Sequence, residues 1–94
     1  MKIILRERAS RALEEKGSEL LARKVDKFHI NIGFSSETNS WHYLRFSRID
    51  EHRILMKFVS TNTDSLILAE DPSNTVLDIT LNIEEFRKIV NNET

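Results

Sequence analysis

The sequence predicts an α+β domain in which an N-terminal helix, a five-stranded antiparallel meander and a C-terminal helix follow one another. Two observations lead to this prediction. Apolar residues recur at helical spacing near both ends of the chain, and they alternate with polar residues through its middle. Short polar turns join the alternating segments, and such connections favour antiparallel neighbours. At 94 residues the chain has the length of one domain, so we expect residues 1–94 to form a single domain.

The first helix is predicted over residues 4–25, because its apolar residues fall three, four or seven positions apart and form one stripe. The members of this stripe are Leu5, Ala9, Ala12, Leu13, Leu20, Leu21, Val25 and Phe28. Gly17 is the weak point, since glycine costs about 1 kcal/mol relative to alanine inside a helix. It either bends one helix or separates two, and we favour one helix. Residues 1–5 alternatively form a short strand.

Five strands are predicted, over residues 27–34, 40–48, 53–60, 65–69 and 75–81. Their alternation gives the sheet an inner and an outer face. The inner-face residues are Phe28, Ile30, Ile32, Phe34, Leu44, Phe46, Ile54, Met56, Phe58, Leu77, Ile79 and Leu81. The outer-face residues are His29, Asn31, Trp41, Tyr43, Arg45, Arg53, Leu55 and Lys57.

The second helix is predicted over residues 83–92. Asn82 precedes it and Glu85 follows three residues later, which is the spacing of a capping box. Its apolar stripe consists of Ile83, Phe86, Ile89 and Val90.

The composition indicates where such a chain works. It contains no cysteine, which excludes disulfides and thiolate metal sites and favours a reducing compartment. The N-terminus has three consecutive apolar residues before charges resume, too few for a signal peptide or a membrane span. We therefore expect a soluble cytoplasmic protein without membrane contact.

Charge is unevenly distributed along the chain. Residues 1–28 carry eight Lys and Arg against five Asp and Glu, whereas residues 29–94 carry six against ten. A basic helix on an acidic body indicates charge complementarity within the molecule or a dimer, or a nucleic-acid-binding arm, and we favour the first. The candidate binding residues of this helix are Arg6, Arg8, Arg11, Arg23 and Lys24.

The outer face of the sheet combines aromatic and cationic side chains. The candidate binding residues on it are Trp41, Tyr43, Arg45, Arg53 and Lys57. Such rings and cations bind single-stranded nucleic acid by stacking on bases and contacting phosphates. The same residue types are enriched at the centres of protein interfaces. A third reading is cross-strand packing, or burial under the first helix.

No pattern in the sequence indicates catalysis. The three histidines, at positions 29, 42 and 52, lack the close spacing of a helix-borne metal site. The acidic pairs Asp50–Glu51 and Glu70–Asp71 lie in predicted turns, where acidic residues are common. We expect no enzyme activity, no metal or other cofactor, and no small-molecule substrate.

These patterns together favour a small non-catalytic module that acts by protein–protein contact, as a regulator or inhibitor of a larger enzyme or complex. The partner is another protein or a second copy of the chain. We expect a homodimer, because the stripe of the first helix is long for a domain with one sheet face to cover. The alternative is a single-stranded nucleic-acid-binding protein that uses the aromatic and basic sheet face.

Overall fold

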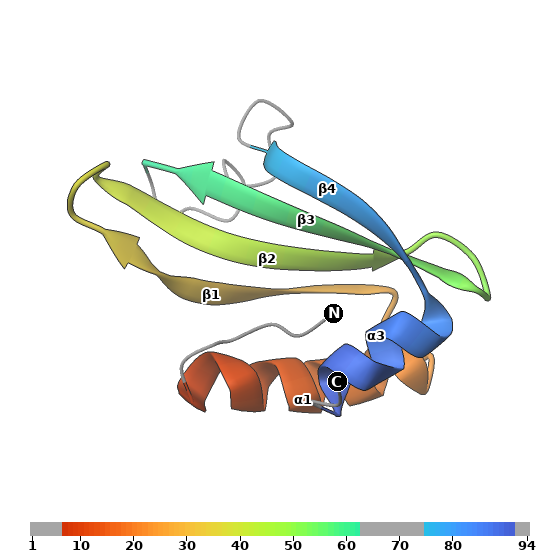
Figure 1. Ribbon diagram of the computed structural model, residues 1–94. Helices are drawn as coiled ribbons and strands as arrows, with labels where there is room; N and C mark the ends of the chain where they lie inside the picture. The colour runs from red at the N-terminus through yellow and green to blue at the C-terminus, as the bar shows by residue number, and fades with distance from the viewer. Residues whose placement is uncertain (1–6, 63–74, 92–94) are drawn as a thin grey trace.

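The computed structural model of the chain describes residues 7–62 and 75–91. The elements are α1 (Glu7–Leu21), β1 (Lys27–Ser35), β2 (Ser40–Arg48), β3 (Arg53–Thr61), β4 (Thr75–Asn82) and α3 (Ile83–Val90). The strands form one antiparallel sheet in the order β1-β2-β3-β4, and both helices lie on the same face of it (Figure 1). The predicted α+β class, with an antiparallel sheet between two helices, is confirmed.

The described residues contain four strands, whereas the sequence predicted five. The fifth predicted strand, over residues 65–69, lies outside the described part of the chain. The four observed strands begin at the predicted residues and end there or one residue later. The C-terminal helix begins at the predicted residue and ends at Val90 rather than at residue 92.

The first helix ends at Leu21, so its predicted end at residue 25 is wrong. The reason is a change of backbone conformation at Arg23, which has a φ of 62°. The N–H of Arg23 donates to the carbonyl of Leu20 (3.1 Å), and that of Lys24 donates to the carbonyl of Glu19 (2.9 Å). This pair of bonds is a Schellman motif, which usually has glycine at the left-handed position. The predicted start at residue 4, and the alternative strand over residues 1–5, lie outside the described residues.

Gly17 neither ends nor separates the helix, because α1 runs through it without interruption. Its Cα faces the side chain of Val90 in α3, and a Cβ built at this position would lie 2.5 Å from the Cγ2 atom of Val90. Real Cβ atoms do not approach other atoms so closely. Glycine is therefore required where α1 and α3 cross, and this contact offsets its low helix propensity.

Most residues of the predicted inner face form the core or pack against it. Opposed residues across β1 and β2, and across β3 and β4, include the pairs Phe28–Phe46 and Ile54–Leu81. The rings of Phe28 and Phe46 stack at 5.0 Å between centroids, and Phe86 of α3 packs against Phe46 at 5.4 Å. The buried residues of this core are Leu13, Leu20, Phe28, Ile30, Leu44, Phe46, Ile54, Met56, Leu81, Phe86, Ile89 and Val90.

A bulge in β1 changes the face of one predicted core residue. The register shifts between Asn31 and Gly33, so that Gly33 opposes His42 and Phe34 opposes Trp41. Because a bulge adds one residue to one strand, every later side chain moves to the other face. The prediction that Phe34 belongs to the inner face is therefore wrong, and its side chain is 47% exposed beside Trp41.

The predicted capping box is confirmed at the start of α3. The side chain of Asn82 accepts a hydrogen bond from the N–H of Glu85 at 2.8 Å, and the Glu85 carboxylate accepts one from the N–H of Asn82 at 3.2 Å. Phe86, Ile89 and Val90 of this helix are buried. The helix thus begins immediately after β4 and turns its apolar stripe onto the sheet.

Arg48 joins the end of α1 to the sheet, a role that the sequence did not indicate. Its Nη2 atom donates to the carbonyl of Leu20 at 2.7 Å, and its backbone N–H donates to the carbonyl of Asp26 at 2.8 Å. The last carbonyls of a helix have no partner within the helix. A guanidinium at this position satisfies one of them and holds α1 against β2.

Candidate functional site

The inner face of the sheet is covered unevenly by the two helices. Leu81 is 1% exposed, whereas Leu77, four residues earlier on the same strand and the same face, is 54% exposed. Val76 beside it is 64% exposed, and Phe58 and Ile79 are half-buried. We call these four residues, Phe58, Val76, Leu77 and Ile79, the apolar patch.

The register of β3 and β4 brings the patch together. Phe58 lies opposite Leu77, and Ile79 lies next along the same face of β4. Val76 is the additional residue where the register shifts between Phe58 and Val59. The ring of His42 lies 5.3 Å from that of Phe58 and borders the patch. Residues from two strands, β3 and β4, thus form one surface.

The short C-terminal helix explains why this surface stays open. A helix of eight residues is about 12 Å long, and it starts at the Leu81 end of β4. Leu77 lies about 13 Å from Leu81 along the strand. Because α3 crosses toward Gly17 of α1, where Val90 packs, it does not extend over Leu77. Neither of the two described helices therefore covers this end of the inner face.

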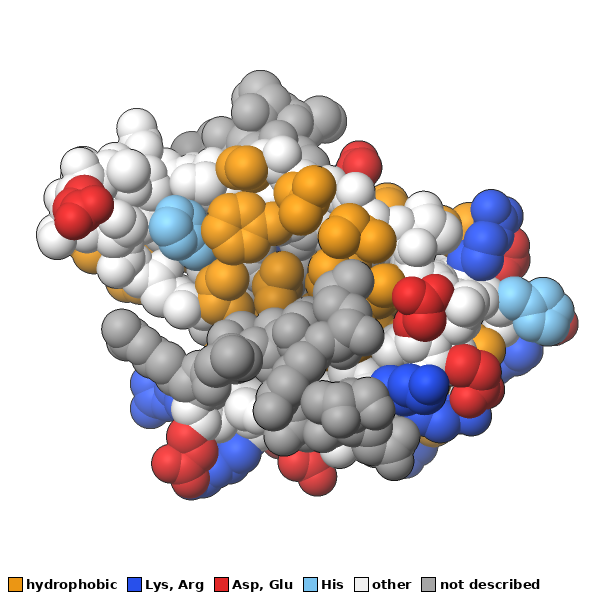
Figure 2. Space-filling model, viewed as in Figure 1, with side chains coloured by type: hydrophobic (Ala, Val, Ile, Leu, Met, Phe, Trp, Pro, Cys, Tyr) orange, Lys and Arg blue, Asp and Glu red, His pale blue; other side chains and the backbone are white. Residues whose placement is uncertain are grey.

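Figure 2 shows hydrophobic side chains gathered in one group on this face, with a histidine at one edge and acidic side chains close to the opposite edge. Isolated exposed apolar residues are ordinary on protein surfaces, whereas contiguous groups mark interaction sites. The sequence assigned Phe58, Leu77 and Ile79 to the inner face, where the structure has them, but it did not indicate that this part of the face is exposed. The signal available was the length of the C-terminal helix, which is too short to cover the strand before it.

The predicted outer-face residues are partly brought together. Across the strands, Tyr43 lies between Asn31 and Val59 in register, and Arg45 lies between His29 and Lys57. Tyr43 is only 3% exposed and Val59 is buried with it, while Trp41 packs against both. The ring of Tyr43 is therefore not available for stacking on a base.

Arg53 lies away from the other predicted outer-face residues, at the start of β3. Its guanidinium forms an ion pair with Asp50 at 2.7 Å, and its Nε atom donates to the same carboxylate at 2.8 Å. The hydrogen bond from Arg53, followed by that from the backbone N–H of His52, lowers the pKa of the Asp50 carboxyl. Arg53 thus stabilises the turn between β2 and β3.

A hollow of about 270 Å³ lies where α1 passes the bulge of β1. Its lining residues are Arg8, Ala9, Asn31, Ile32, Gly33 and Trp41. The side-chain oxygen of Asn31 accepts a hydrogen bond from the N–H of Gly33 at 2.8 Å, so the bulge is held by its own residues. The hollow combines one cation, one amide and one indole, which specify no particular ligand.

The predicted basic helix does not carry a continuous positive surface. Arg11 forms an ion pair with Glu7 at 2.6 Å, and Arg23 lies 3.6 Å from Glu51. Lys24 is exposed beyond the end of α1, and Arg6 lies outside the described residues.

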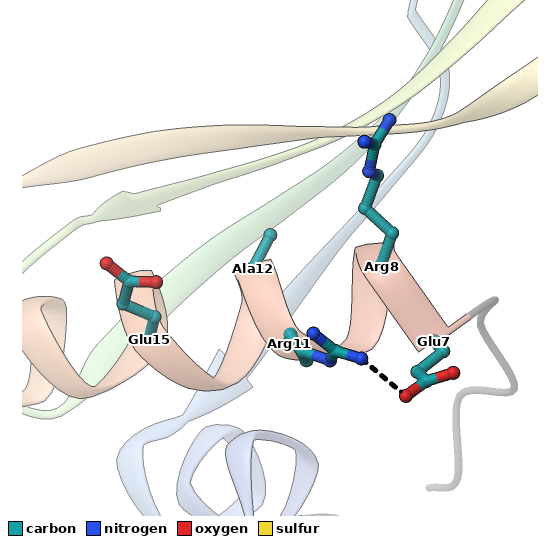
Figure 3. A pocket seen from close by; sticks show the side chains of 5 residues that line it. All are labelled: Glu7, Arg8, Arg11, Ala12 and Glu15. Atoms are coloured by element: carbon teal, nitrogen blue, oxygen red, sulfur yellow. Dashed lines mark hydrogen bonds and ion pairs between the residues drawn. The ribbon is translucent and has the colours of Figure 1, made fainter.

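A second hollow on this helix, of about 380 Å³, is lined by Glu7, Arg8, Arg11, Ala12 and Glu15. Figure 3 shows Arg11 turned toward Glu7 and Arg8 directed toward the strands. Two acidic and two basic side chains line this hollow together, so it does not favour a polyanion.

Among residues 7–62 and 75–91, no three His, Asp or Glu side chains gather closely enough to hold a metal ion. Neither described helix has the length and apolar character needed to cross a membrane. No protein family, no curated protein and no solved structure matches this chain. The candidate site is therefore defined by the geometry of the chain itself.

Proposed function

We propose that this protein is a small non-catalytic binding module that acts by protein–protein contact through the apolar patch. The observation that carries the proposal is the exposure of Leu77 on the helix-bearing face of the sheet, beside the exposed Val76 at the register shift of β4. Ile79 and Leu81 of the same strand are at least half-buried. Burying such side chains against a partner contributes about 25 cal/mol per Å² of apolar surface. A regulator or inhibitor of a larger enzyme or complex works by contact of this kind.

The residue types and arrangement of the apolar patch are typical of the centre of a protein interface. An aromatic residue and aliphatic residues lie next to each other on two paired strands, with His42 at one border. Residues presented on strands lose little conformational freedom on binding, which favours affinity. The candidate binding residues on the outer face of the sheet present a smaller binding surface, because Tyr43 is buried and Arg53 is paired with Asp50.

The test uses one substitution inside the patch and one matched control. Leu77→Lys places a charge in the patch, whereas Ile49→Lys changes another exposed aliphatic residue (44% exposed) in the turn after β2. Both variants and the wild type are immobilised and exposed to an extract of the source cells. Recovered proteins are identified by mass spectrometry, purified, and titrated against all three chains.

We expect a purified partner that binds the wild type and Ile49→Lys and loses at least about tenfold in affinity for Leu77→Lys, as for truncation at an interface centre. Equal affinity for all three chains would overturn the proposal. A parallel titration follows the fluorescence of Trp41 while a single-stranded oligonucleotide is added at low salt. Quenching that weakens as salt is raised, and that Leu77→Lys leaves unchanged, would assign function to the outer face instead.

A further inference from the structure

We propose that the partner of the apolar patch is a second copy of this chain, joined edge to edge through β4 about a two-fold axis at Ile79. This inference rests on the proposed function and names its partner. β4 is the last strand in the order β1-β2-β3-β4, and no described residue pairs with its outer edge. The pairing would make one continuous sheet from the two copies.

The backbone groups of β4 show which residues can pair. Ile83 donates its N–H to the carbonyl of His52, which continues the β3–β4 register by one residue. Because hydrogen-bonded and non-hydrogen-bonded pairs alternate in an antiparallel ladder, the even-numbered residues of β4 direct their N–H and C=O groups outward. Asn82 is the exception, since its N–H already donates to Glu85. Asp78 and Thr80 are therefore the central groups available to a second strand.

Two registers give the greatest overlap of two antiparallel copies of β4. An axis at Asp78 would place two carboxylates opposite each other, which is destabilising. An axis at Ile79 places Asp78 opposite Thr80 of the second copy and Leu77 opposite its Leu81. The apolar residues of the inner face then meet across the axis, and no like charges face each other. Charge and polarity thus select the axis at Ile79.

The same register matches the two unequal ends of β4. Leu77 is exposed, whereas Leu81 lies under the start of α3. Antiparallel pairing about Ile79 puts the uncovered end of each strand beside the helix-covered end of the other. Each exposed Leu77 then lies beside the buried Leu81 of the other copy, so the same contact occurs twice, as a two-fold interface requires.

The first helix does not supply an interface of this kind. Ala9, Leu13 and Leu20 of its stripe are buried against the chain's own core. Among the described residues, the two most exposed large apolar side chains, Val76 and Leu77, both lie on β4.

The absence of cysteine from the chain permits a direct test of the register. In the proposed dimer Ile79 opposes itself in a non-hydrogen-bonded pair, where Cα atoms lie about 4.5 Å apart. That distance suits a disulfide. Purified Ile79→Cys, Leu77→Cys and Asp78→Cys are each oxidised mildly, and the initial rates of covalent dimer formation are compared. We expect Ile79→Cys to cross-link at least about tenfold faster than the other two, as the geometric limits on the bond require.

Light scattering over a range of concentrations gives the second readout, which does not depend on a cysteine. Thr80→Asp would face Asp78 of the second copy and weaken the dimer about fivefold, and Thr80→Lys would tighten it by a similar factor. Thr38→Asp and Thr38→Lys, in the turn after β1, make the same changes of charge away from β4 and should leave the dimer unchanged.

A wild type that stays monomeric at all concentrations would overturn the inference. Fastest cross-linking of Leu77→Cys or Asp78→Cys would overturn its register. If the wild type is monomeric and Leu77→Lys still loses a purified partner of another sequence, the proposed function stands and the self-association fails. If Leu77→Lys changes neither partner binding nor dimerisation, both fail.

Discussion

The two ends of β4 differ in cover although they share one strand, one face and one residue type. Leu81 is 1% exposed under α3, and Leu77 is 54% exposed beyond it. The alternation of side chains places both leucines on the inner face. Whether an inner-face residue is buried depends on where the helices lie, and the helices cover only one end. The Leu81 end of β4 therefore stabilises the fold, whereas the Leu77 end is accessible to a partner.

The largest expected effect tests this comparison within one strand. Leu81→Ala should lower the free energy of unfolding by about 2–5 kcal/mol, because it leaves a cavity in the core. Leu77→Ala should lower it by less than about 1 kcal/mol, because surface substitutions change stability little. Urea unfolding at a concentration where the protein is monomeric measures both. Equal losses would mean that the two ends of β4 contribute alike to stability, contrary to their unequal burial.

The next effect concerns the contact between Gly17 of α1 and Val90 of α3, where the two helices cross. Gly17→Ala should lower the free energy of unfolding by about 1–2 kcal/mol, since overpacking against Val90 outweighs the gain in helix propensity. Thermal and urea unfolding measure the loss.

Val90→Ala provides the matched background, because it removes the two γ carbons that the new Cβ would meet most closely. There, Gly17→Ala should be neutral or stabilising. A loss that persists in this background would show that the crossing of α1 and α3 does not require glycine.

The smallest effect has the opposite sign and lies where α1 ends. Arg23 has a φ of 62°, a conformation that favours glycine. Arg23→Gly should raise the free energy of unfolding by about 1 kcal/mol, because a glycine has no Cβ to strain there. The ion pair with Glu51 is exposed and contributes little, so its loss should not cancel the gain. Glu51→Gln measures that contribution separately, and a net loss in Arg23→Gly would contradict the motif.

Much of the fold was predictable because its signals are local. The strand positions follow from alternation and from polar turns, and the capping box follows from the spacing of Asn82 and Glu85. The end of the first helix was not predictable from its stripe, because Val25 continues the helical spacing after the backbone has already reversed. Helical spacing of apolar residues does not by itself show where the chain leaves the helix.

The candidate site was predictable only in part. The sequence correctly brings Trp41, Tyr43 and Arg45 to one face of β2. It cannot show that Tyr43 is buried, because exposure depends on segments distant in sequence. The apolar patch was missed for the same reason, since Leu77 and Leu81 have the same pattern in the sequence.

The sequence alone predicted a helix at each end of an antiparallel sheet and the positions of the four described strands. It placed the end of the first helix four residues too late, but it predicted the face on which most strand residues lie. These depend on the repeat of the backbone, which is 3.6 residues in a helix and two in a strand. Three features became evident only in the tertiary structure. They are the bulge that moves Phe34 to the outer face, the close approach of α1 and α3 at Gly17, and the extent to which the helices cover β4. Those depend on packing between distant segments, because a surface is buried only when another element lies over it.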